Sequence, residues 1–482
     1  MANRYWVNGS GNWDDYLNHW ATSSGGTSGG TPSEITTGGD FTGGSGSWGM
    51  GIGVTYVDNH LHIDATIIGG ATLGWNFSPV YLSIYSVEFD ITNSNNTGTF
   101  YVYIGSTRSV DINNTNGHKQ VFITHVGGEN MFVTFESGAI CDFDNGSILE
   151  YLSILPTTSD NVFLDSNSGL SGQTITLNAS AVFNDFTSTT GVSFTIINSF
   201  NGLDCYGSLT FESGITYAGD VEMFATSAGE QITTGGATLG GISFYGIGGG
   251  WALQDDLLMT DSAFYIENGT FDANDHNVTA NDFYFYADTG YNPTVIMGSG
   301  TWEATGNSYV WFLDQYSGEY ITIMPETSTI KLSNSSTTQK IFAYYDDTST
   351  ITGTTYYNLW LTGSGTGVFQ IWGSNTFNEF RIDTPPHTIL FNGGETSSVN
   401  SFVVSRTNNN VITINNYDTT TQHNLSKSSG TVICDYLDIS NSNATGGATW
   451  YAGSHSNDTT NNDGWIFTDP TWYNKGNFLG LF

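Results

Sequence analysis

The chain has 482 residues with 45 acidic and only 9 basic side chains, so its formal net charge is −36. This charge excludes a nucleic-acid partner, because binding to a phosphate backbone needs clustered Lys and Arg, and it disfavours an anionic membrane surface. Only 11% of the residues are charged but 14% are aromatic, which excludes a disordered chain.

The same composition predicts an all-β fold. Aromatic residues, Thr and Val favour strands, whereas Gly, Asn and Ser favour the turns between them. No window of the sequence has the apolar spacing of an amphipathic helix. We therefore expect an elongated, mainly parallel β-solenoid (β-helix) with an N-terminal aromatic cap and a short C-terminal extension.

Residues 1–40 differ in composition from the rest of the chain. The stretch "RYWVNGSGNWDDYLNHW" precedes a Gly/Ser/Thr run and lacks the apolar segment of a signal peptide. A solenoid exposes an unpaired strand at its end, so a distinct cap is expected there. The rings of this segment either cover the first turn or anchor the chain to a partner. The candidate anchor residues are Tyr5, Trp6, Trp13, Tyr16 and Trp20.

Residues 41–425 are predicted to form an irregular solenoid. Short sequences recur, such as "DITNSNNTG" at 90–98 and "DISNSNATG" at 438–446. Their separations share no single period, which is typical of solenoid turns with variable insertions. Alternating apolar residues, such as Phe380 with Ile382 and Ile389 with Phe391, indicate strands with one buried face.

The C-terminal part divides into a β module at 426–470 and an apolar tail at 471–482. The tail ends in "NFLGLF". An exposed apolar tail usually packs against its own fold or a partner, which makes it a second candidate attachment segment. Its candidate residues are Phe478, Leu479, Leu481 and Phe482.

Carboxylates are the first candidates for catalysis, because glycosidases use two acids. The adjacent pairs Asp14–Asp15, Asp255–Asp256 and Asp346–Asp347 would point to opposite faces of a strand. A working pair would have to come from different turns of the solenoid. A lyase would need a basic residue beside acids, and Arg108, Arg381 and Arg406 are the arginines on strand-like segments. We expect these arginines to be paired or solvated, and we assign no catalytic residue.

The sequence predicts no cofactor. Oxygen-rich loops at 271–277 and 456–464 suit a structural Ca²⁺ ion, but turns capped by Asn and Asp explain them equally well, and no metal ligand is assigned. The nine histidines lack the spacing of a zinc site. Cys141, Cys205 and Cys434 lie far apart, and we expect them to be buried free thiols.

Aromatic-rich strands at 283–291 and 309–320 should present rings on both faces. The inward rings belong to the core. The outward rings suit a subunit contact in a trimer, stacking on sugars, or plain packing on the strand surface.

Three segments carry a family resemblance. They are "RYWVNGSGNWDDYLNHW", "TGSGTGVFQIWGSNTFNEFRIDTPPHTILF", and "LSKSSGTVICDYLDISNSNATGGATWYAGSHSNDTTNNDGWIF". These segments resemble Gly/Thr/Ser-rich β-helical structural proteins, fibre-like or adhesin-like, of environmental bacteriophages and uncultured bacteria. The resemblance covers residues 4–31 and about 326–467. It implies a virion fibre or adhesin and supplies no catalytic residues.

We therefore expect a non-enzymatic phage virion protein, a tail fibre, spike or adhesin that contacts the host surface. A capsid fibre or decoration protein is one alternative, and a glycan depolymerase on a β-helix is the other. The expected partners are other virion proteins, a host surface glycan and further copies of the chain in a homotrimer, with no nucleic acid and no membrane. The protein would be made in the host cytoplasm without a signal peptide and carried on the particle surface.

Overall fold

The structure is a computed structural model that describes most of the chain, in two compact units. The described residues are 2–29, 33–34, 49–50, 54–57, 60–65, 70–75, 84–104, 106–124, 131–136, 139–151, 155–169, 171–198, 202–260, 262–316, 318–346, 348, 350–363, 367–383, 387–405, 410–418 and 421–471. One unit comprises 1–3, 9–13 and 156–482, and the other comprises 4–8 and 14–155. No helix in the described residues is long and apolar enough to cross a membrane.

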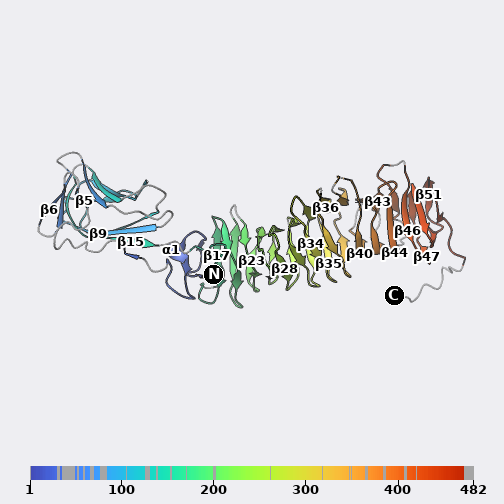
Figure 1. Ribbon diagram of the computed structural model, residues 1–482, viewed down its shortest axis with the longest axis horizontal. Helices are drawn as coiled ribbons and strands as arrows, with labels where there is room; N and C mark the ends of the chain where they lie inside the picture. The colour runs from blue at the N-terminus through green and yellow to red at the C-terminus, as the bar shows by residue number, and fades with distance from the viewer. Residues whose placement is uncertain are drawn as a thin grey trace. The chain divides into compact units, whose positions relative to one another are not determined.

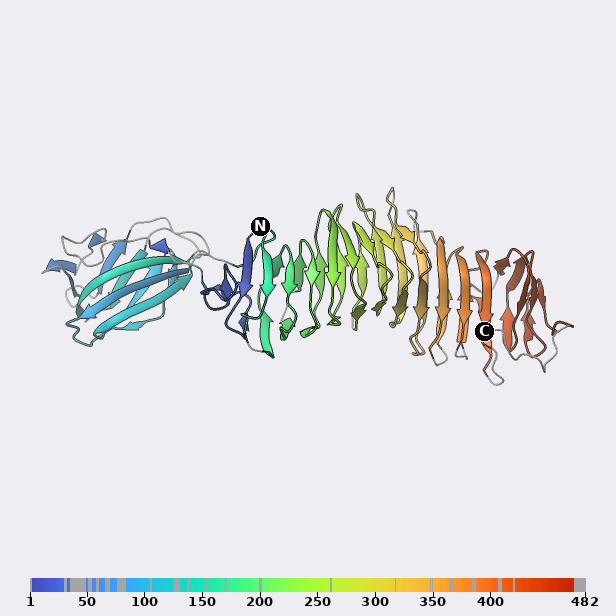
Figure 2. The ribbon, with the colours of Figure 1, turned by 90° about the horizontal axis from the view of Figure 1, so that it is seen from below.

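The larger unit is a parallel β-solenoid of about 13 turns, which confirms the predicted fold class. Figure 1 and Figure 2 show its strands side by side from β17 to β51. Three long sheets run along it, here called sheets I, II and III.

Sheet I contains β16 (Asn161–Leu164), β19 (Phe186–Ser188), β22 (Leu209–Thr210), β25 (Ala228–Thr233), β28 (Gly250–Leu253), β31 (Thr270–Asp272), β34 (Thr294–Ile296) and β37 (Thr322–Met324). Sheet II contains β18 (Ala181–Phe183), β21 (Leu203–Cys205), β24 (Val221–Met223), β27 (Ile242–Phe244), β30 (Phe264–Ile266), β33 (Phe283–Ala287), β36 (Ser308–Gln315), β39 (Lys340–Tyr345), β41 (Val368–Ile371), β43 (His387–Phe391), β45 (Ile412–Asn416), β48 (Leu437–Ser440) and β51 (Asn457–Thr460).

Sheet III contains β26 (Thr238–Leu239), β29 (Leu257–Met259), β32 (Val278–Ala280), β35 (Thr301–Ala304), β38 (Thr329–Leu332), β40 (Thr355–Leu361), β42 (Thr376–Ile382), β44 (Thr396–Val404), β46 (His423–Lys427) and β49 (Ser442–Gly446). Two shorter parallel sheets contain β2 (Gly11–Asn12), β17 (Gln173–Leu177), β20 (Phe194–Asn198) and β23 (Ile215–Tyr217), and β47 (Thr431–Ile433), β50 (Thr449–Tyr451) and β52 (Trp465–Ile466).

The solenoid core is built by side chains that stack in register from turn to turn. On sheet II the inward residues Phe264, Phe283, Trp311 and Phe342 are successive register partners, and all four are buried. The ring centroids of Phe283 and Trp311 lie 5.1 Å apart. The alternation predicted from the sequence is confirmed, because Phe380, Ile382, Ile389 and Phe391 are all buried.

The smaller unit contains a sandwich of two antiparallel sheets. One sheet has β13 (Gly117–Thr124), β9 (Ile84–Thr92), β15 (Ile140–Tyr151), β7 (His60–Asp64) and β6 (Val54–Val57), with β4 (Ser33–Glu34) beside β15. The other has β11 (Thr107–Arg108), β10 (Thr99–Ile104), β14 (Met131–Glu136), β8 (Gly70–Trp75) and β5 (Gly49–Met50), with β12 (Ile112–Asn113) beside β10. Phe89 and Phe143 of the first sheet pack against Phe100 and Phe135 of the second.

This sandwich corrects the expected solenoid boundaries of 41–425. The described strands between 54 and 151 pair antiparallel, and the solenoid proper begins near 156. Residues 426–470 are no separate module, since β46 pairs with β44 and β48 with β45 in the long sheets. Alternation and turn residues predict a strand, but the same pattern suits a parallel or an antiparallel partner, so the pairing was misassigned.

The repeated nonamer illustrates the point. Residues 90–92 end the antiparallel strand β9, whereas residues 438–440 belong to the parallel strand β48. Asn93 and Asn441, at the same place in the two copies, both have a positive φ, 49° and 51°. The two copies therefore share a strand end followed by a left-handed Asn, after which the first forms a loop and the second continues as strand β49 (Ser442–Gly446).

Replacing a stacked core residue should destabilise the solenoid strongly. Phe380 is fully buried and contacts Phe377 and Phe402. We expect Phe380→Ala to cost about 3–5 kcal/mol of unfolding free energy, because it leaves a cavity in a stack that cannot collapse. Thr388→Ala, on the outward face of β43, is the matched control, and chemical denaturation measures both. Equal costs for the two variants would mean that Phe380 is not in the core.

Candidate functional site

The N-terminal aromatic residues lie mostly in the interior of the fold. Trp6, Trp13, Tyr16 and Trp20 are buried, and Tyr5 is half-buried. Trp6 stacks on His19 and meets Trp20 edge-on at 5.2 Å, where β1 (Asn3–Trp6) pairs with β3 (Trp20–Ala21) beside the short helix α1 (Tyr16–His19). An anchor for a partner needs exposed rings, so the predicted attachment role of these residues is corrected to a role in the core. The other candidates, Phe478, Leu479, Leu481 and Phe482, lie outside the described residues.

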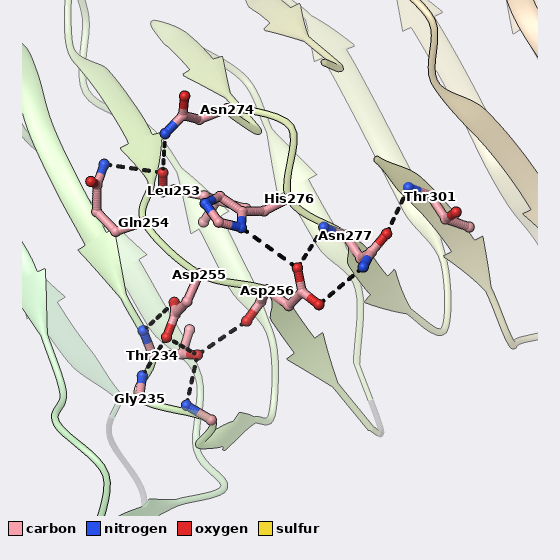
Figure 3. Close-up of polar contacts among 11 residues, drawn as sticks. Thr234, Gly235, Leu253, Gln254, Asp255, Asp256, Asn274, His276, Asn277 and Thr301 are labelled. Atoms are coloured by element: carbon pink, nitrogen blue, oxygen red, sulfur yellow. Dashed lines mark hydrogen bonds and ion pairs between the residues drawn. The ribbon is translucent and has the colours of Figure 1, made fainter. Parts of the chain in front are cut away.

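The adjacent carboxylates Asp255 and Asp256 turn toward different partners, although they lie in the turn between β28 and β29 and not on a strand as the sequence analysis assumed. Figure 3 shows the carboxylate of Asp255 accepting hydrogen bonds from the backbone N–H groups of Thr234 and Gly235, both at 2.7 Å. Asp256 instead accepts from the backbone N–H and the side-chain amide of Asn277, at 2.9 and 3.0 Å. These bonds hold the pKa of Asp256 below its usual range. The pair ties successive turns together and shares no common site.

The arginines proposed for a lyase are paired, as the sequence analysis expected. Arg381 contacts Asp383 at 3.3 Å and lies over the ring of Trp360. Arg108 pairs with Asp111 and lies over Tyr101. Arg406 lies outside the described residues.

The oxygen-rich loops use their side chains to cap turns. In the loop at 456–464, Asn462 donates to Asp458, and in the loop at 271–277 the carboxylate of Asp272 accepts from the backbone of Asn274. Within the described part of the chain, no group of three His, Cys, Asp or Glu side chains is placed to hold a metal ion. A structural Ca²⁺ ion stays a prediction.

One carboxyl pair does come from different turns. Asp204 on β21 and Glu222 on β24 are direct register partners, and both side chains point outward from sheet II. Neighbouring strands lie about 4.8 Å apart, so the two acids stand side by side. In the described part of the chain neither carboxyl forms an ion pair with Lys, Arg or His.

Burial and like charge perturb this pair. Burial raises the pKa of Asp204 above its ordinary value. Burial also raises the pKa of Glu222, and the charges of Asp204 and Asp220 raise it further. Because two neighbouring carboxylates repel one another, ionisation of one disfavours ionisation of the other.

A column of half-buried aromatic rings runs beside the pair on the same face of sheet II. Tyr206 stacks on Phe224 at 5.2 Å, and Phe224 stacks on Tyr245 at 5.5 Å. The column continues through Tyr265 and Tyr286. These outward rings cover each other's faces, so they pack the turns together and leave mainly their edges to solvent.

Asp204 and Glu222 were missed in the sequence although a local signal marks them. "LDCY" at 203–206 and "VEMF" at 221–224 both read apolar, acidic, apolar, aromatic. Aligning the two tetrapeptides as successive turns would have placed the acids side by side. The sequence has 45 acidic residues, and it does not show how many residues separate equivalent positions of successive turns. Without that number the two acids cannot be recognised as neighbours.

Similarity to known proteins is found among solved structures alone. No protein-family model and no curated protein matches the chain. Among solved structures, the catalytic domain of Agl-KA matches with a TM-score of 0.20 at 10% identity, over 86% of this chain and 96% of that one. A GH87 α-1,3-glucanase catalytic domain in complex with tetrasaccharides matches with a TM-score of 0.17 at 10% identity, over 90% and 98%. The catalytic unit of the GH87 α-1,3-glucanase from Streptomyces thermodiastaticus matches with a TM-score of 0.18 at 13% identity, over 85% and 91%.

The solved structures that match are catalytic domains, against the expectation of a non-enzymatic protein, and that expectation is not carried further. At these TM-scores the matches transfer no activity and no residue role to this chain. Any catalytic assignment has to come from its own side chains.

Asp282, next to β33 on sheet II, provides a test of how burial shifts the pKa of carboxyl groups on the outer face of that sheet. Its Oδ1 is buried without a hydrogen-bond partner in the described structure, and burial raises its pKa to about 6. The fold favours the protonated form, so stability falls as pH rises from about 4, where an unfolded Asp ionises, to about 6. Asp282→Asn removes this titration. We expect it to raise the melting temperature at pH 7.5 by more than at pH 4.

Thr388→Ala, on the outward face of the same sheet, is the control and should leave the pH dependence of melting unchanged, because it removes no titratable group. A melting temperature of Asp282→Asn that tracks the wild type at both pH values would contradict the raised pKa.

Proposed function

We propose that the chain is a glycan hydrolase whose two catalytic carboxyl groups, Glu222 and Asp204, come from adjacent turns of the solenoid. The observation that carries the proposal is that the two residues are direct register partners and both point outward from sheet II, and that among the described residues neither pairs with a cation. Like charges directly opposite one another destabilise a sheet. Elsewhere on its surface the solenoid avoids this cost, for example by placing Lys331 as the register partner of Glu303. An uncompensated pair is therefore a functional candidate.

The pKa shifts divide the roles. Burial and the charges of Asp204 and Asp220 raise the pKa of Glu222, so Glu222 binds its proton more tightly than an ordinary Glu and is assigned the role of general acid. It donates that proton to the glycosidic oxygen as the bond to the anomeric carbon breaks. Burial alone raises the pKa of Asp204. Asp204 serves as the carboxylate that attacks the anomeric carbon.

The distance between the two carboxyl groups favours hydrolysis with retention of configuration at the anomeric carbon. Carboxyl groups about 5–5.5 Å apart leave no room for a water between acid and sugar, and the spacing of neighbouring strands is of this size. A covalent glycosyl ester on Asp204 would form first. Glu222, now a carboxylate, would then take a proton from water as that water attacks the anomeric carbon, which releases the sugar and restores both groups.

The surroundings of the pair suit a neutral glycan. Ser243 is the next register partner after Glu222 and offers a hydroxyl, and Tyr265 follows it. The edges of Tyr206 and Phe224 flank the acids on the same face. A polyanionic substrate would be repelled by a chain of net charge −36.

The expected place on a phage particle, the contact with a host surface and the trimer stay predictions. A glycan hydrolase agrees with the depolymerase alternative of the sequence analysis. Imaging of purified particles with an antibody to this chain would test the location, and light scattering would test the oligomer against the monomer mass of 52.0 kDa.

Hydrolysis is tested by the release of reducing ends from soluble α- and β-glucans, xylan and mannan. We expect activity on at least one of them. Glu222→Gln should lose at least about 100-fold, since general acid catalysis contributes that much. Asp204→Asn should lose at least as much, because it removes the attacking carboxylate. The activity should fall on the alkaline side at a pH above the usual range of Glu, because Glu222 must be protonated. NMR of the first product should show a retained anomeric configuration.

Glu379→Gln, an outward carboxyl on β42 of sheet III, is the matched control and should keep full activity. Release of no reducing ends from any of these polysaccharides, or an unchanged rate in Glu222→Gln, would falsify the proposed function.

A further inference from the structure

A groove lies on sheet III, away from the acid pair of sheet II. Its volume is about 420 Å³, and it is lined by Asp256, Asn277, Thr301, Glu303, Lys331 and Trp360 together with Leu258 and Thr279. Five successive turns contribute these residues, so the groove runs along the stacking direction for about 19 Å, four intervals between strands. It can hold an extended chain of several sugar units.

The hydrogen bonds along one wall fix its polar groups. Figure 3 shows Asn277 donating to Asp256 while its own carbonyl oxygen accepts from the backbone of Thr301 at 2.9 Å. His276 also approaches Asp256, with its Nδ1 at 3.6 Å. Carboxylate and amide groups are thus held in place on three consecutive turns, with remaining acceptor capacity toward the groove.

The second wall ends in a tryptophan held by charged neighbours. The row of register partners runs Leu258, Thr279, Glu303, Lys331 and Trp360. Lys331 pairs with Glu303 at 3.0 Å, and its Nζ lies 5.3 Å from the centre of the Trp360 ring. The indole N–H of Trp360 donates to Asp383 at 2.8 Å. The ring is therefore fixed in one orientation at the end of the groove.

We propose that this groove binds a neutral polysaccharide chain, as a binding site separate from the hydrolytic pair. Fixed carboxylate, amide and hydroxyl groups suit the many hydroxyl groups of a sugar chain. The ring of Trp360 lies between Lys331 and Arg381 of the neighbouring turns, so its edge, together with the exposed side chain of Leu258, supplies the apolar contacts for sugar rings. A polyanion is disfavoured, because each cation in the groove region is already paired with a carboxylate and the net charge is strongly negative. The site would keep the chain on a polymeric substrate whether or not the pair on sheet II cleaves it.

The proposal is tested by binding of the full chain to cellulose, insoluble α-1,3-glucan, xylan and mannan, with alginate and heparin as polyanions. We expect binding to at least one neutral polysaccharide and none to the polyanions. Trp360→Ala should weaken that binding about tenfold or more, as the loss of an aromatic anchor does. Tyr320→Ala, which removes an exposed ring elsewhere on the solenoid, is the control and should bind as the wild type does.

Thermal melting checks that Trp360→Ala is folded, and Thr279→Lys, which fills the groove without touching Trp360, provides a second variant that should lose binding. Glu222→Gln should bind normally, so a failure of the hydrolase proposal and a failure of the groove proposal are distinguishable. The groove proposal is overturned if the wild type binds none of the neutral polysaccharides, if it binds the polyanions as well, or if both groove variants bind like the wild type.

Discussion

The solenoid depends on one constraint, the in-register stacking of each strand on the equivalent strand of the next turn. A side chain on one turn meets the side chain at the same position of the next turn, about 4.8 Å away. In the core, this stacking produces continuous rows of side chains such as Phe264, Phe283 and Trp311. At the corners it produces amide ladders, in which Asn461 donates to Asn441 and Asn441 to Asn415. This ladder pairs the buried amide of Asn441, which a lone turn would leave unpaired.

The same constraint makes the outer surface sensitive to charge. Where unlike groups stack, as Glu303 with Lys331, the register contributes about 0.2–1 kcal/mol, and where like groups stack the sign reverses. Asp204 and Glu222 are in the second situation, and half-burial increases the cost because water screens them less. In-register stacking of outward side chains has little effect on the stability of most neighbouring turns. Where two acids stack, the same register raises the pKa of one acid through the charge of the other.

The sequence was sufficient to predict the elements but not all of their partners. Alternation located the strands and the buried face, as Phe380 and Ile382 show, and Asn or Gly located the turns. The antiparallel sandwich was missed because the strand pattern of "DITNSNNTG" and of "DISNSNATG" is the same while their pairing differs. Local residues determine φ at Asn93 and Asn441, whereas the pairing partner is chosen by packing of a distant core. The N-terminal rings were ambiguous for a similar reason, since a buried and an exposed cluster of Trp and Tyr have the same composition.

The site residues were hidden because they are defined by register. A single-residue insertion in β24 would turn Glu222 inward and bring a core residue outward, which the hydrophobic stack forbids. The core therefore holds Asp204 and Glu222 opposite each other more rigidly than a loop could, although the turns between them can vary in length. This separation explains how a solenoid can carry different functional rows on its outer face. Inward residues maintain the register, outward residues are free to change, and a pair of acids needs only matching positions on two neighbouring turns.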